Sequence, residues 1–542
     1  MKYKFLIIVF SLLQPMLLLI CLNCSSEEKV DTLHILHINS LYGRIFPTTE
    51  KVRKNESIYY GGANLISQAI NKVKKISGQS PILIGNSNMF YDSPIGYFTR
   101  GEAVVNVMNK LEFDCIVLGE RDFLFKKQEL VNLNKLSNFP FLCSNLVNAD
   151  GLTPNYFKPY IIIEKAGFKI GVIGIASENI LKFMHDEKLK GLKVTPIDEA
   201  VKKYSNVLKK KSVDFVIVAG DLNYSFPIEE SANNNYKDSN KEIISAISPE
   251  KVDIYLFKSY GDILSDNNLI TKCNGIVSLR NNNDKLKTIF VVPEKGYVLS
   301  DTYYVRDKNE FKHTLEIINS DNFKPDIDFS TFLNTCYKTF DQKSNAVLGY
   351  SKTAIRYENA MYNLVTDAIK YYANTNIAFI DGDSVIGGLK KGEITRLSLY
   401  NQYPSDDILY RISITGDDLL SMLRFCSANA SYFLTKNLQV SGLSFKYNLS
   451  NNYEDRLLKN SVLVNHTPVK VNNIYSIAIT QRLLDKLNTY RKLQKINIKP
   501  EKKFPDTVRN IIEKYVQKLH VIKPTLENRI INLRPECIEV KP

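Results

Sequence analysis

Alternation of apolar runs with amphipathic segments between residues 31 and 325 constrains the fold of this chain more than any other feature. The apolar runs are short and rich in β-branched and aromatic residues, as strands are, and the segments between them repeat apolar residues at helical spacing. Strands that alternate with helices are typical of an α/β domain. The predicted strands are 32–38, 81–84, 115–118, 160–164, 169–175, 215–219, 254–257 and 288–292, and the predicted helices are 62–75, 102–110, 197–211 and 241–247.

The length of the chain predicts more than one domain. At 542 residues it exceeds what one hydrophobic core usually serves. Polar residues surround a short apolar segment in 326–345, which is interpreted as a linker that can include a helix. A second α/β unit is expected over 346–520, followed by a tail over 521–542. The expected elements of the second unit are helices at 360–372, 419–426 and 507–519, a strand at 377–380, and a strand pair at 408–414 and 440–447.

The N-terminus has the pattern of a secretion signal. A short basic segment precedes an apolar run at 5–22, and Pro15 near the middle of the run favours cleavage over a permanent membrane span. Cys21 and Cys24 close the run, which resembles the lipobox of bacterial lipoproteins, where a cysteine is acylated and becomes the mature N-terminus. A polar Ser/Glu tether directly follows Cys24, which is therefore the preferred lipidation site, with Cys21 as the alternative.

These features predict a lipoprotein signal peptide over residues 1–24, with an uncleaved anchor as the alternative. In both cases the first expected partner is a membrane, reached through the N-terminal anchor. The expected location is the bacterial cell envelope, on either the periplasmic side or the outer surface.

Charge and cysteine spacing limit the other partners. The formal net charge of +14 allows weak attraction to anionic surfaces, but the basic residues are spread along the chain, so no specific nucleic-acid binding is expected. The cysteines beyond the signal region lie far apart without C-x-x-C spacing, which favours buried free thiols over a zinc cluster or a disulfide framework.

Several segments of the first half resemble one known family. Residues 33–44 (LHILHINSLYGR), 61–65 (GGANL), 101–109 (GEAVVNVMN) and 139–146 (FPFLCSNL) are similar to successive motifs of the 5′-nucleotidase and UDP-sugar hydrolase family. The resemblance covers nearly the whole mature chain. It implies an N-terminal four-layer αββα metallophosphoesterase-like sandwich over 31–325 and a smaller α/β domain of the 5′-nucleotidase C-terminal type.

The positions that hold metal in this family carry other residues here. The family's reaction uses two divalent ions, bound by carboxylates and imidazoles, to generate a hydroxide and to neutralise the phosphoryl transition state. The family's ligands come from a D-x-H loop, an Asp in a G-D turn, a G-N-H-E motif and histidines after two later strands. The corresponding positions in this chain hold Ser40, Tyr42, Asn88, Glu120, Arg121, Asp221, Ser259 and Gly261.

None of the six histidines of the chain falls on a ligand position. A site offering at most Asn88, Glu120, Asp122 and Asp221 is not expected to hold a dinuclear centre, so no metal cofactor and no catalytic residues are predicted. Arg121 stands where the family has its catalytic histidine. A guanidinium can replace the positive charge of lost metal ions, and the resulting hypothesis is that Arg121 points into the vacated site and pairs with Asp221 or Asp122.

The second unit resembles the nucleotide-binding domain of the same family. Residues 360–369, 392–395 (GEIT), 414–419 (ITGDDL) and 439–447 (QVSGLSFKY) match its motifs. The positions that bind phosphate, base and sugar in the family are again altered. They hold Asp381, Asp383, Ile386, Ser405, Asp407 and Asn448.

Convergence of Asp381, Asp383, Asp406 and Asp407 would make the former nucleotide pocket acidic and repel a phosphate. Such a cluster can hold a cation or a basic partner, or it can consist of exposed loop carboxylates. The aromatic residues nearby that remain available to stack on a ring are Tyr403, Phe445 and Tyr447.

Loss of the metal ligands predicts a catalytically inactive envelope lipoprotein that uses the family's fold for binding or structural work, with a protein or a small molecule as its unknown ligand. One alternative is a diverged 5′-nucleotidase hydrolase active in nucleotide catabolism through a relocated or single-metal site. A second alternative is a solute-binding lipoprotein that captures a nucleoside or a sugar between its domains.

Overall fold

The computed structural model describes residues 32–53, 56–177, 180, 191–225, 252–264, 270–280, 286–291, 297–357, 359–488, 498, 500–523 and 526–533. The predicted signal peptide, with Cys21 and Cys24, and the predicted helix 241–247 lie outside these residues. The chain divides into two compact units, Met1–Phe340 and Asp341–Pro542. Within the described ranges, no helix has the length and apolar character needed to cross a membrane.

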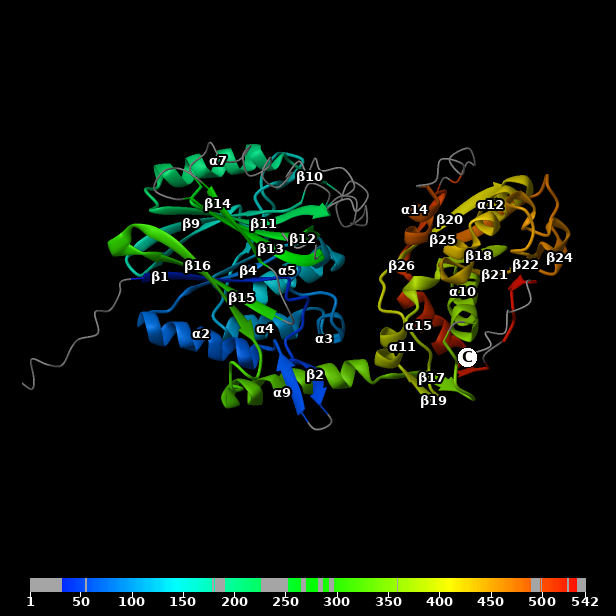
Figure 1. The fold of residues 1–542 in the computed structure, drawn as a ribbon, viewed down its shortest axis with the longest axis horizontal. Helices are drawn as coiled ribbons and strands as arrows, with labels where there is room; N and C mark the ends of the chain where they lie inside the picture. The colour runs from blue at the N-terminus through cyan, green and yellow to red at the C-terminus, as the bar shows by residue number, and fades with distance from the viewer. Residues whose placement is uncertain are drawn as a thin grey trace, which may run out of the picture. The chain divides into compact units, whose positions relative to one another are not determined.

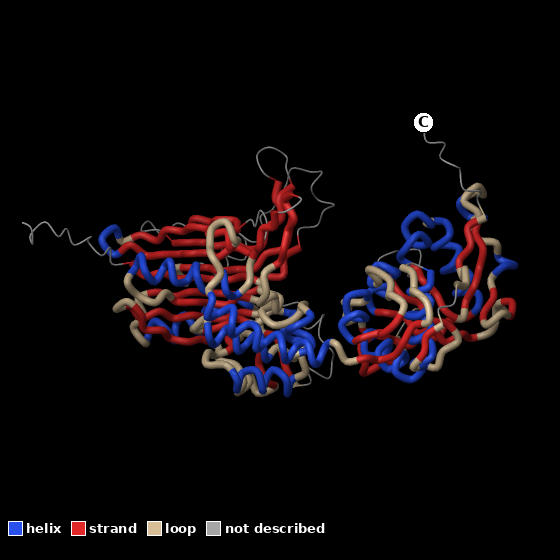
Figure 2. The backbone as a smooth tube through the Cα atoms, turned by 90° about the horizontal axis from the view of Figure 1, so that it is seen from below, coloured by secondary structure: helices blue, strands red, loops and turns tan. Residues whose placement is uncertain are grey.

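Two six-stranded sheets lie face to face in the first unit (Figures 1 and 2). Their strand orders are β16-β15-β1-β4-β5-β6 and β14-β13-β12-β11-β9-β8. The strands of the first sheet are β1 (Thr32–Asn39), β4 (Ile82–Asn86), β5 (Cys115–Val117), β6 (Phe141–Leu142), β15 (Tyr297–Val305) and β16 (Glu310–Ile318). Those of the second are β8 (Tyr160–Lys165), β9 (Phe168–Ile175), β11 (Phe215–Ser225), β12 (Ile254–Leu264), β13 (Ile270–Arg280) and β14 (Leu286–Val291).

Helices cover the outer faces of both sheets, which completes four layers. Figure 1 shows α7 (Ile197–Lys210) over the second sheet, and α2 (Ala63–Ser77) and α4 (Glu102–Lys110) over the first. The apolar side of α7, including Val201 and Leu208, packs on strand residues such as Ile173. A separate core, including Ile35 and Val172, fills the space between the sheets. The four-layer αββα architecture predicted from the sequence is therefore confirmed.

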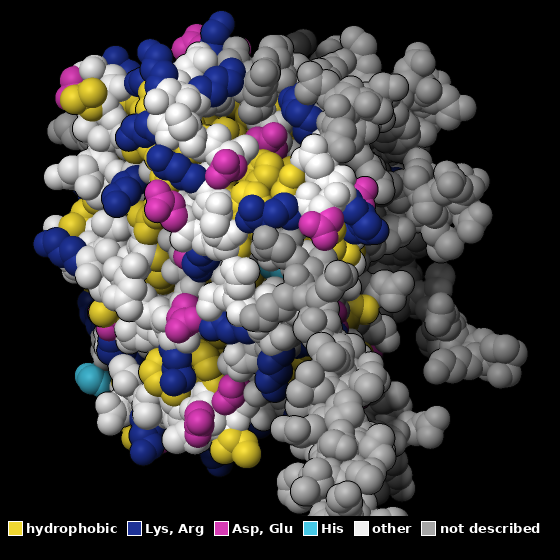
Figure 3. Space-filling model, turned by 90° about the vertical axis from the view of Figure 1, so that its left-hand side faces the viewer, with side chains coloured by type: hydrophobic (Ala, Val, Ile, Leu, Met, Phe, Trp, Pro, Cys, Tyr) yellow, Lys and Arg dark blue, Asp and Glu magenta, His cyan; other side chains and the backbone are white. Residues whose placement is uncertain are grey.

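The described part of the first unit also contains two short helices and two strand pairs. They are α3 (Pro94–Phe98), α5 (Lys127–Leu136), β2 (Thr48–Arg53) with β3 (Glu56–Tyr60), and β7 (Leu146–Asn148) with β10 (Leu192–Val194). On the face seen in Figure 3, described Lys and Arg side chains are interspersed with Asp and Glu, as on an ordinary solvated surface.

Parallel strands bring distant loops to one edge of the sandwich. Strands β1, β4 and β5 are parallel neighbours in the first sheet, and β9, β11 and β12 are parallel neighbours in the second. The side chain of Asn86 at the end of β4 donates to the carbonyls of Gly220 (3.3 Å) and Leu256 (3.1 Å) in the second sheet. The carboxyl ends of the two parallel sets therefore meet, which is where ligands bind in open α/β sheets.

The segment predicted as a linker, 326–345, is a helix, α9 (Ile327–Ser344). It packs on the first unit: Asn64 Nδ2 donates to Ser330 Oγ (3.1 Å), and the ring of Phe340 lies 6.2 Å from that of Phe98. The first unit consequently extends to Phe340 rather than ending at 325. The polar composition of this segment favours a boundary between domains. Its apolar residues nevertheless fall at helical spacing, and they are buried on one side of the helix.

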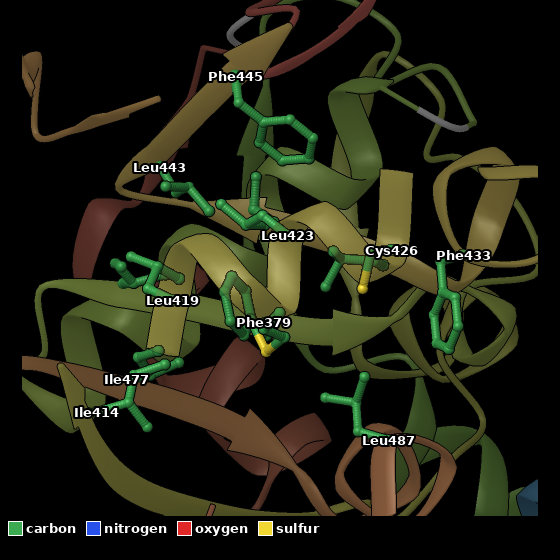
Figure 4. Close-up of a cluster of buried hydrophobic side chains, with 14 of the residues drawn as sticks. Phe379, Ile414, Leu419, Leu423, Cys426, Phe433, Leu443, Phe445, Ile477 and Leu487 are labelled. Carbon is green, nitrogen blue, oxygen red and sulfur yellow. The ribbon is translucent and has the colours of Figure 1, made fainter. Parts of the chain in front are cut away.

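The second unit is built on a sheet of strand order β21-β18-β25-β20-β26. These strands are β18 (Ile377–Asp381), β20 (Ile408–Thr415), β21 (Leu438–Ser441), β25 (Ile474–Thr480) and β26 (Lys502–Thr507). The helices are α10 (Asn359–Ala373), α11 (Arg396–Gln402), α12 (Gly416–Ala428), α14 (Gln481–Asn488) and α15 (Val508–Leu519). One core joins the sheet to α10 and α15, and another joins it to α12 and α14 (Figure 4).

The expected strand pair of 408–414 and 440–447 does not form. Strand β20 pairs with β25 and β26, while residues 440–447 divide at Gly442 between β21 and β22 (Leu443–Tyr447). Gly442 has a φ of 70°, a conformation that favours glycine and lets the chain leave the sheet.

The predicted tail, 521–542, is part of the fold as far as it is described. Strand β27 (Val521–Ile522) pairs with β17 (Val347–Ser351), which also pairs with β19 (Gly392–Thr395). Strand β28 (Ile530–Asn532) pairs with β22. Short apolar pairs inside a polar segment are weak sequence signals, so pairing with distant strands was not foreseeable from the segment itself.

Candidate functional site

The positions aligned with the family's metal ligands lie together at the edge where the two parallel strand sets end. Ser40 and Tyr42 follow β1, Asn88 follows β4, and Glu120 and Arg121 follow β5. Backbone hydrogen bonds join the first two loops, from Ser40 N to the carbonyl of Asn86 (3.0 Å) and from Tyr42 N to that of Asn88 (2.8 Å). Asp221 lies in β11. Ser259 and Gly261 lie in β12, and their side chains are outside the described part of the structure.

The loops at this edge have an unusual backbone. Ser40, Tyr42, Ser87 and Asn88 all have positive φ, between 46° and 61°. Such conformations cost on the order of 1–3 kcal/mol each for residues other than glycine and cluster at functional sites. Gly119 makes the approach of the third loop possible, because a Cβ there would lie 2.1 Å from Ser87 Oγ.

A lysine outside the aligned positions lies at the centre of this edge. Lys258 Nζ is 2.8 Å from Asp221 Oδ2 and 4.0 Å from Glu120 Oε1. The side chain of Lys258 has no exposed surface and that of Asp221 is 1% exposed. Ser87 Oγ donates to the same Asp221 oxygen over 3.0 Å. The buried carboxylate is therefore held by an ammonium ion and a hydroxyl of this chain.

Asp122 shapes the loop after β5 rather than pairing with Arg121. Its carboxylate is fully buried and accepts the backbone N–H groups of Phe90 (2.9 Å) and Gly119 (3.0 Å). Burial raises the pKa of Asp122 to about 6, although these hydrogen bonds and the nearby charge of Lys258 oppose the rise.

The hypothesis that Arg121 enters the vacated site is wrong. Arg121 Nε lies 2.6 Å from Asp92 Oδ2, and the arginine side chain is 48% exposed. Its backbone N–H donates to Asn88 Oδ1 (2.9 Å). At the surface the guanidinium keeps much of its hydration, while the ammonium of Lys258 approaches Asp221 from the neighbouring strand.

Several neutral polar groups surround the charged centre. Ser40 Oγ, Tyr42 OH and Asn88 Nδ2 are buried and have no hydrogen-bond partner among the described residues. Over the same residues, no three His, Cys, Asp or Glu side chains gather in a way that could hold a metal ion. The described residues at this edge offer the ammonium of Lys258, the Arg121–Asp92 pair, carboxylates that contact Lys258 or backbone N–H groups, and neutral hydroxyl and amide groups.

The histidines of β1 are structural. His34 Nδ1 is 2.9 Å from Asp301 Oδ2, and its Nε2 is 3.1 Å from Thr32 Oγ1. His37 is buried, and its burial, together with the charge of His313, lowers the pKa of His37 to about 3, so it is neutral at physiological pH.

The former nucleotide site of the second unit is not the acidic pocket considered above. Asp381, which has no exposed surface, lies 2.8 Å from both Arg482 Nε and Lys486 Nζ, and Lys486 is 3.2 Å from Asp383. Burial alone would lower the pKa of Lys486, but hydrogen bonds to Asp381 and Asp383 raise it. The two carboxylates are therefore balanced by cations from α14 and its start.

Asp407 is hydrogen-bonded within the protein, and Asp406 lies near a buried cation. Asp407 Oδ2 accepts the hydroxyls of Ser384 (2.7 Å) and Tyr403 (3.1 Å), and burial raises the pKa of Asp407. Asp406 Oδ1 is 3.2 Å from Nη2 of the buried Arg509. The remaining altered positions differ in exposure. Ile386 is 60% exposed, and Asn448 and Ser405 lie in loops outside the sheet.

None of the aromatic residues expected to stack on a ligand is available for it. Tyr403 has no exposed surface, Phe445 is 1% exposed, and Tyr447 is 7% exposed. Figure 4 shows Phe445 among Leu423 and Leu443 in the core that packs beneath α12. The alternation of side chains along β22 puts Phe445 and Tyr447 on its buried face, so the stacking prediction is wrong.

Comparison with known proteins finds relatives for the whole chain. Residues 343–494 match the family model described as 5′-nucleotidase, C-terminal domain. Protein 5NUC of Lutzomyia longipalpis is 24% identical over 595 residues, which cover 97% of this chain and 97% of that protein. Endonuclease YhcR of Bacillus subtilis is 24% identical over 446 residues, covering 77% of this chain and 34% of the endonuclease. The chain thus spans about a third of that second relative.

The fold is shared with a solved structure of the same kind. The 5′-nucleotidase precursor from Thermus thermophilus has a TM-score of 0.55 to this chain at 17% identity, with 93% of this chain and all of the other covered. The similarity extends over both units, so the predicted order of a metallophosphoesterase-like domain followed by a C-terminal α/β domain is confirmed.

Proposed function

Because this chain belongs to the 5′-nucleotidase family, we propose that it has kept the fold of those enzymes without their metal-dependent reaction. In this proposal it is a binding or structural protein of the bacterial cell envelope. The observation that carries the proposal is the buried contact of Lys258 with Asp221.

The ammonium of Lys258 supplies the positive charge that a metal ion supplies in such a site. Asp221 stands at an aligned ligand position, and its Oδ2 atom is engaged by Lys258 at 2.8 Å and by Ser87 at 3.0 Å. A divalent cation brought to the same oxygen would be repelled by a fully buried positive charge only a few ångströms away. It would also have to displace a charge-assisted hydrogen bond.

The other aligned positions offer poor ligands for catalytic metals. Hydrolytic centres use imidazole and carboxylate ligands, because these bind divalent ions strongly and tune the bound water. Ser40, Tyr42 and Asn88 supply neutral hydroxyl and amide groups instead, and the carboxylate of Asp122 is bound to two backbone N–H groups. The replaced metal ligands and the buried lysine both support the proposal that this site does not bind metal.

Metal analysis and turnover on the purified chain test this proposal. The protein is supplied with Mn²⁺, Zn²⁺ or Mg²⁺, metal is counted after gel filtration, and release of phosphate from a 5′-mononucleotide is measured. We expect less than one metal ion per chain and no turnover above buffer. Stoichiometric metal with chelator-sensitive turnover would overturn the proposal and would mean that another set of ligands holds the ions.

The proposed location has its own test. Acylation at Cys24 would tether both units to a membrane through the polar segment that follows it. Metabolic labelling with a fatty acid is expected to label the wild type and Cys21→Ser, and to leave Cys24→Ser unlabelled. Label retained in Cys24→Ser but absent from Cys21→Ser would reassign the lipid to Cys21. An unlabelled wild type would contradict lipidation altogether.

A further inference from the structure

A hollow on the surface of the first unit lies between α2, the end of α4 and the start of α9. Its volume is about 240 Å³, which is the liquid volume of about eight water molecules at roughly 30 Å³ each, so it suits a small compound. The apolar residues that border it, Ile70, Leu111 and Phe329, are at most 5% exposed, which leaves charged and amide groups as its accessible wall. Its described lining includes none of the positions aligned with the family's metal ligands.

Four polar side chains of this wall already have partners within the chain. Lys74 Nζ lies 2.7 Å from Glu112 Oε2, so these two charges balance each other. Asp326 accepts the hydroxyl of Ser67 over 3.0 Å and the backbone N–H of Phe329 over 2.9 Å, and its carboxylate thereby caps the start of α9. These contacts connect α2 with the end of α4 and with α9, and they need no ligand.

Three other polar side chains of the same wall have no such partner. Lys110 and Asp328 form no ion pair with each other or with any other described side chain, and the amide of Asn71 makes no hydrogen bond to a described residue. Lys110 Nζ lies 5.6 Å from the ring centre of Phe329 and 5.2 Å from that of Phe332. The rings hold the ammonium beside the hollow, but they carry no net charge that neutralises it. An unpaired cation and an unpaired anion therefore border one hollow.

Opposite charges that are not paired with each other fit a ligand that carries both. A carboxylate on the ligand would form a charge-assisted hydrogen bond with Lys110, and an ammonium group would form one with Asp328. A simple anion would gain the first contact but would face the carboxylates of Asp326 and Asp328. A simple cation would gain the second contact but would face the ammonium of Lys110. The amide of Asn71 both donates and accepts, which suits a further polar group.

We propose that this hollow binds a small polar amino acid in its zwitterionic form. Lys110 holds the carboxylate of the ligand, Asp328 holds its ammonium group, and the amide of Asn71 bonds to a polar side chain. A large apolar side chain gains little here, because the accessible wall is polar. Since Lys110 ends α4 and Asp328 lies in the first turn of α9, the bound amino acid joins these two helices. The site does not include the Lys258–Asp221 pair, so it does not depend on the loss of metal binding.

Calorimetry and saturation-transfer NMR with the purified chain test the proposal. The ligands are glycine, serine, asparagine and glutamine, compared with acetate and methylamine, which each carry one of the two charges. We expect saturable binding of at least one amino acid at about 10 mM or below, and at least about tenfold weaker binding of acetate and of methylamine. No binding of any amino acid in this range, or equal binding of a singly charged compound, would overturn the proposal.

Charge-removing variants locate the binding. Lys110→Gln should weaken amino-acid binding about tenfold and reduce the preference for the amino acid over methylamine, whereas Asp328→Asn should weaken it similarly and reduce the preference over acetate. A merely structural role of either residue would not produce this reciprocal pattern. Lys75→Gln and Asp321→Asn are the matched controls, since they remove the same charges from exposed positions outside the described lining. Equal affinity of all four variants and the wild type would place the amino acid elsewhere and contradict the proposal. A thermal melt of each variant without ligand checks that the fold is intact.

Discussion

Lys258 and Asp221 form a buried ion pair between adjacent parallel strands, with Nζ 2.8 Å from Oδ2 and neither side chain exposed by more than 1%. Each charge depends on the other, because an isolated ion in such a place would lose its hydration without compensation. The pair therefore has consequences for stability as well as for metal binding.

Removal of the lysine is expected to destabilise the first unit. Lys258→Met leaves the carboxylate of Asp221 buried with only the hydroxyl of Ser87 among the contacts described above. A broken buried pair typically costs about 3–5 kcal/mol, and chemical denaturation of the whole chain measures the loss.

Lys72→Met is the matched control for Lys258→Met. Lys72 pairs with Glu316 at 2.8 Å, but its side chain is 51% exposed, so its loss should cost less than about 1 kcal/mol. Adding Asp221→Asn to Lys258→Met should recover part of the stability, because the uncompensated charge is then gone. Equal costs for Lys258→Met and Lys72→Met would contradict the role assigned to the buried pair.

The buried carboxyl of Asp122 should make stability depend on pH. Burial raises its pKa in the folded chain to about 6, from an ordinary value of 3.8. Between these pH values the folded state binds more protons than the unfolded state. The contribution of Asp122 to the free energy of unfolding therefore falls as pH rises through that window. Asp122→Asn cannot titrate. The free energy of unfolding of the wild type, minus that of Asp122→Asn, should therefore fall by about 1–3 kcal/mol from pH 4 to pH 7.

Denaturation midpoints of both proteins at pH 4, 5, 6 and 7 supply the measurement for Asp122. The comparison of the two chains cancels the contributions of other carboxyl groups. A gap that stays constant over this range would mean that Asp122 titrates no differently in the folded and unfolded chains.

The second unit offers a test of how Asp381 is compensated. Lys486→Met removes the cation that contacts both Asp381 and Asp383, and we expect a loss of about 1–3 kcal/mol because Asp381 has no exposed surface. Arg482→Met removes the other cation, whose side chain is 48% exposed, and should cost less. The reverse order in urea denaturation would show that the arginine is the main partner of Asp381.

Arg529 is expected to be the strongest anchor of the segment that contains β28. It pairs with Asp367 of α10 and is only 12% exposed, so Arg529→Met should cost about 2–4 kcal/mol. Arg424→Met, on the exposed side of α12, is the comparison and should change stability by less than about 0.5 kcal/mol. Limited proteolysis should also cut Arg529→Met in the segment 521–533 earlier than the wild type. Unchanged cleavage and stability would show that strand pairing alone holds the segment.

The position of the first candidate site could be predicted from the sequence because it depends on strand order. Ser40, Asn88 and Glu120 follow successive parallel strands, and the ends of such strands share one edge. Lys258 was missed because the predicted strand stopped at 257, whereas β12 continues to Leu264. Lys258 lies just beyond the predicted end of the strand, and the direction of its side chain depends on strand pairing that the sequence does not reveal.

The second unit shows the opposite case, in which local pattern was the better guide. Leu443, Phe445 and Tyr447 alternate with polar residues, and this alternation alone predicts one buried face for β22. Resemblance to a nucleotide-binding motif suggested ligand contact for the same aromatic rings. The pairing of Asp381 with Arg482 and Lys486 could not be predicted from local pattern, because these cations lie about 100 positions later in the chain.

The contact between Arg529 and Asp367 joins residues 162 positions apart. A ribosome adding about 5–20 residues per second needs on the order of ten to thirty seconds to cover that distance. During this interval helix α10 already exists as a nascent segment, while the arginine and the strand that complete its surroundings have not been made. The surroundings of α10 therefore stay incomplete until β28 has been synthesised. A chain that stalls before this point leaves the edge of β22 unpaired and accessible to chaperones and proteases.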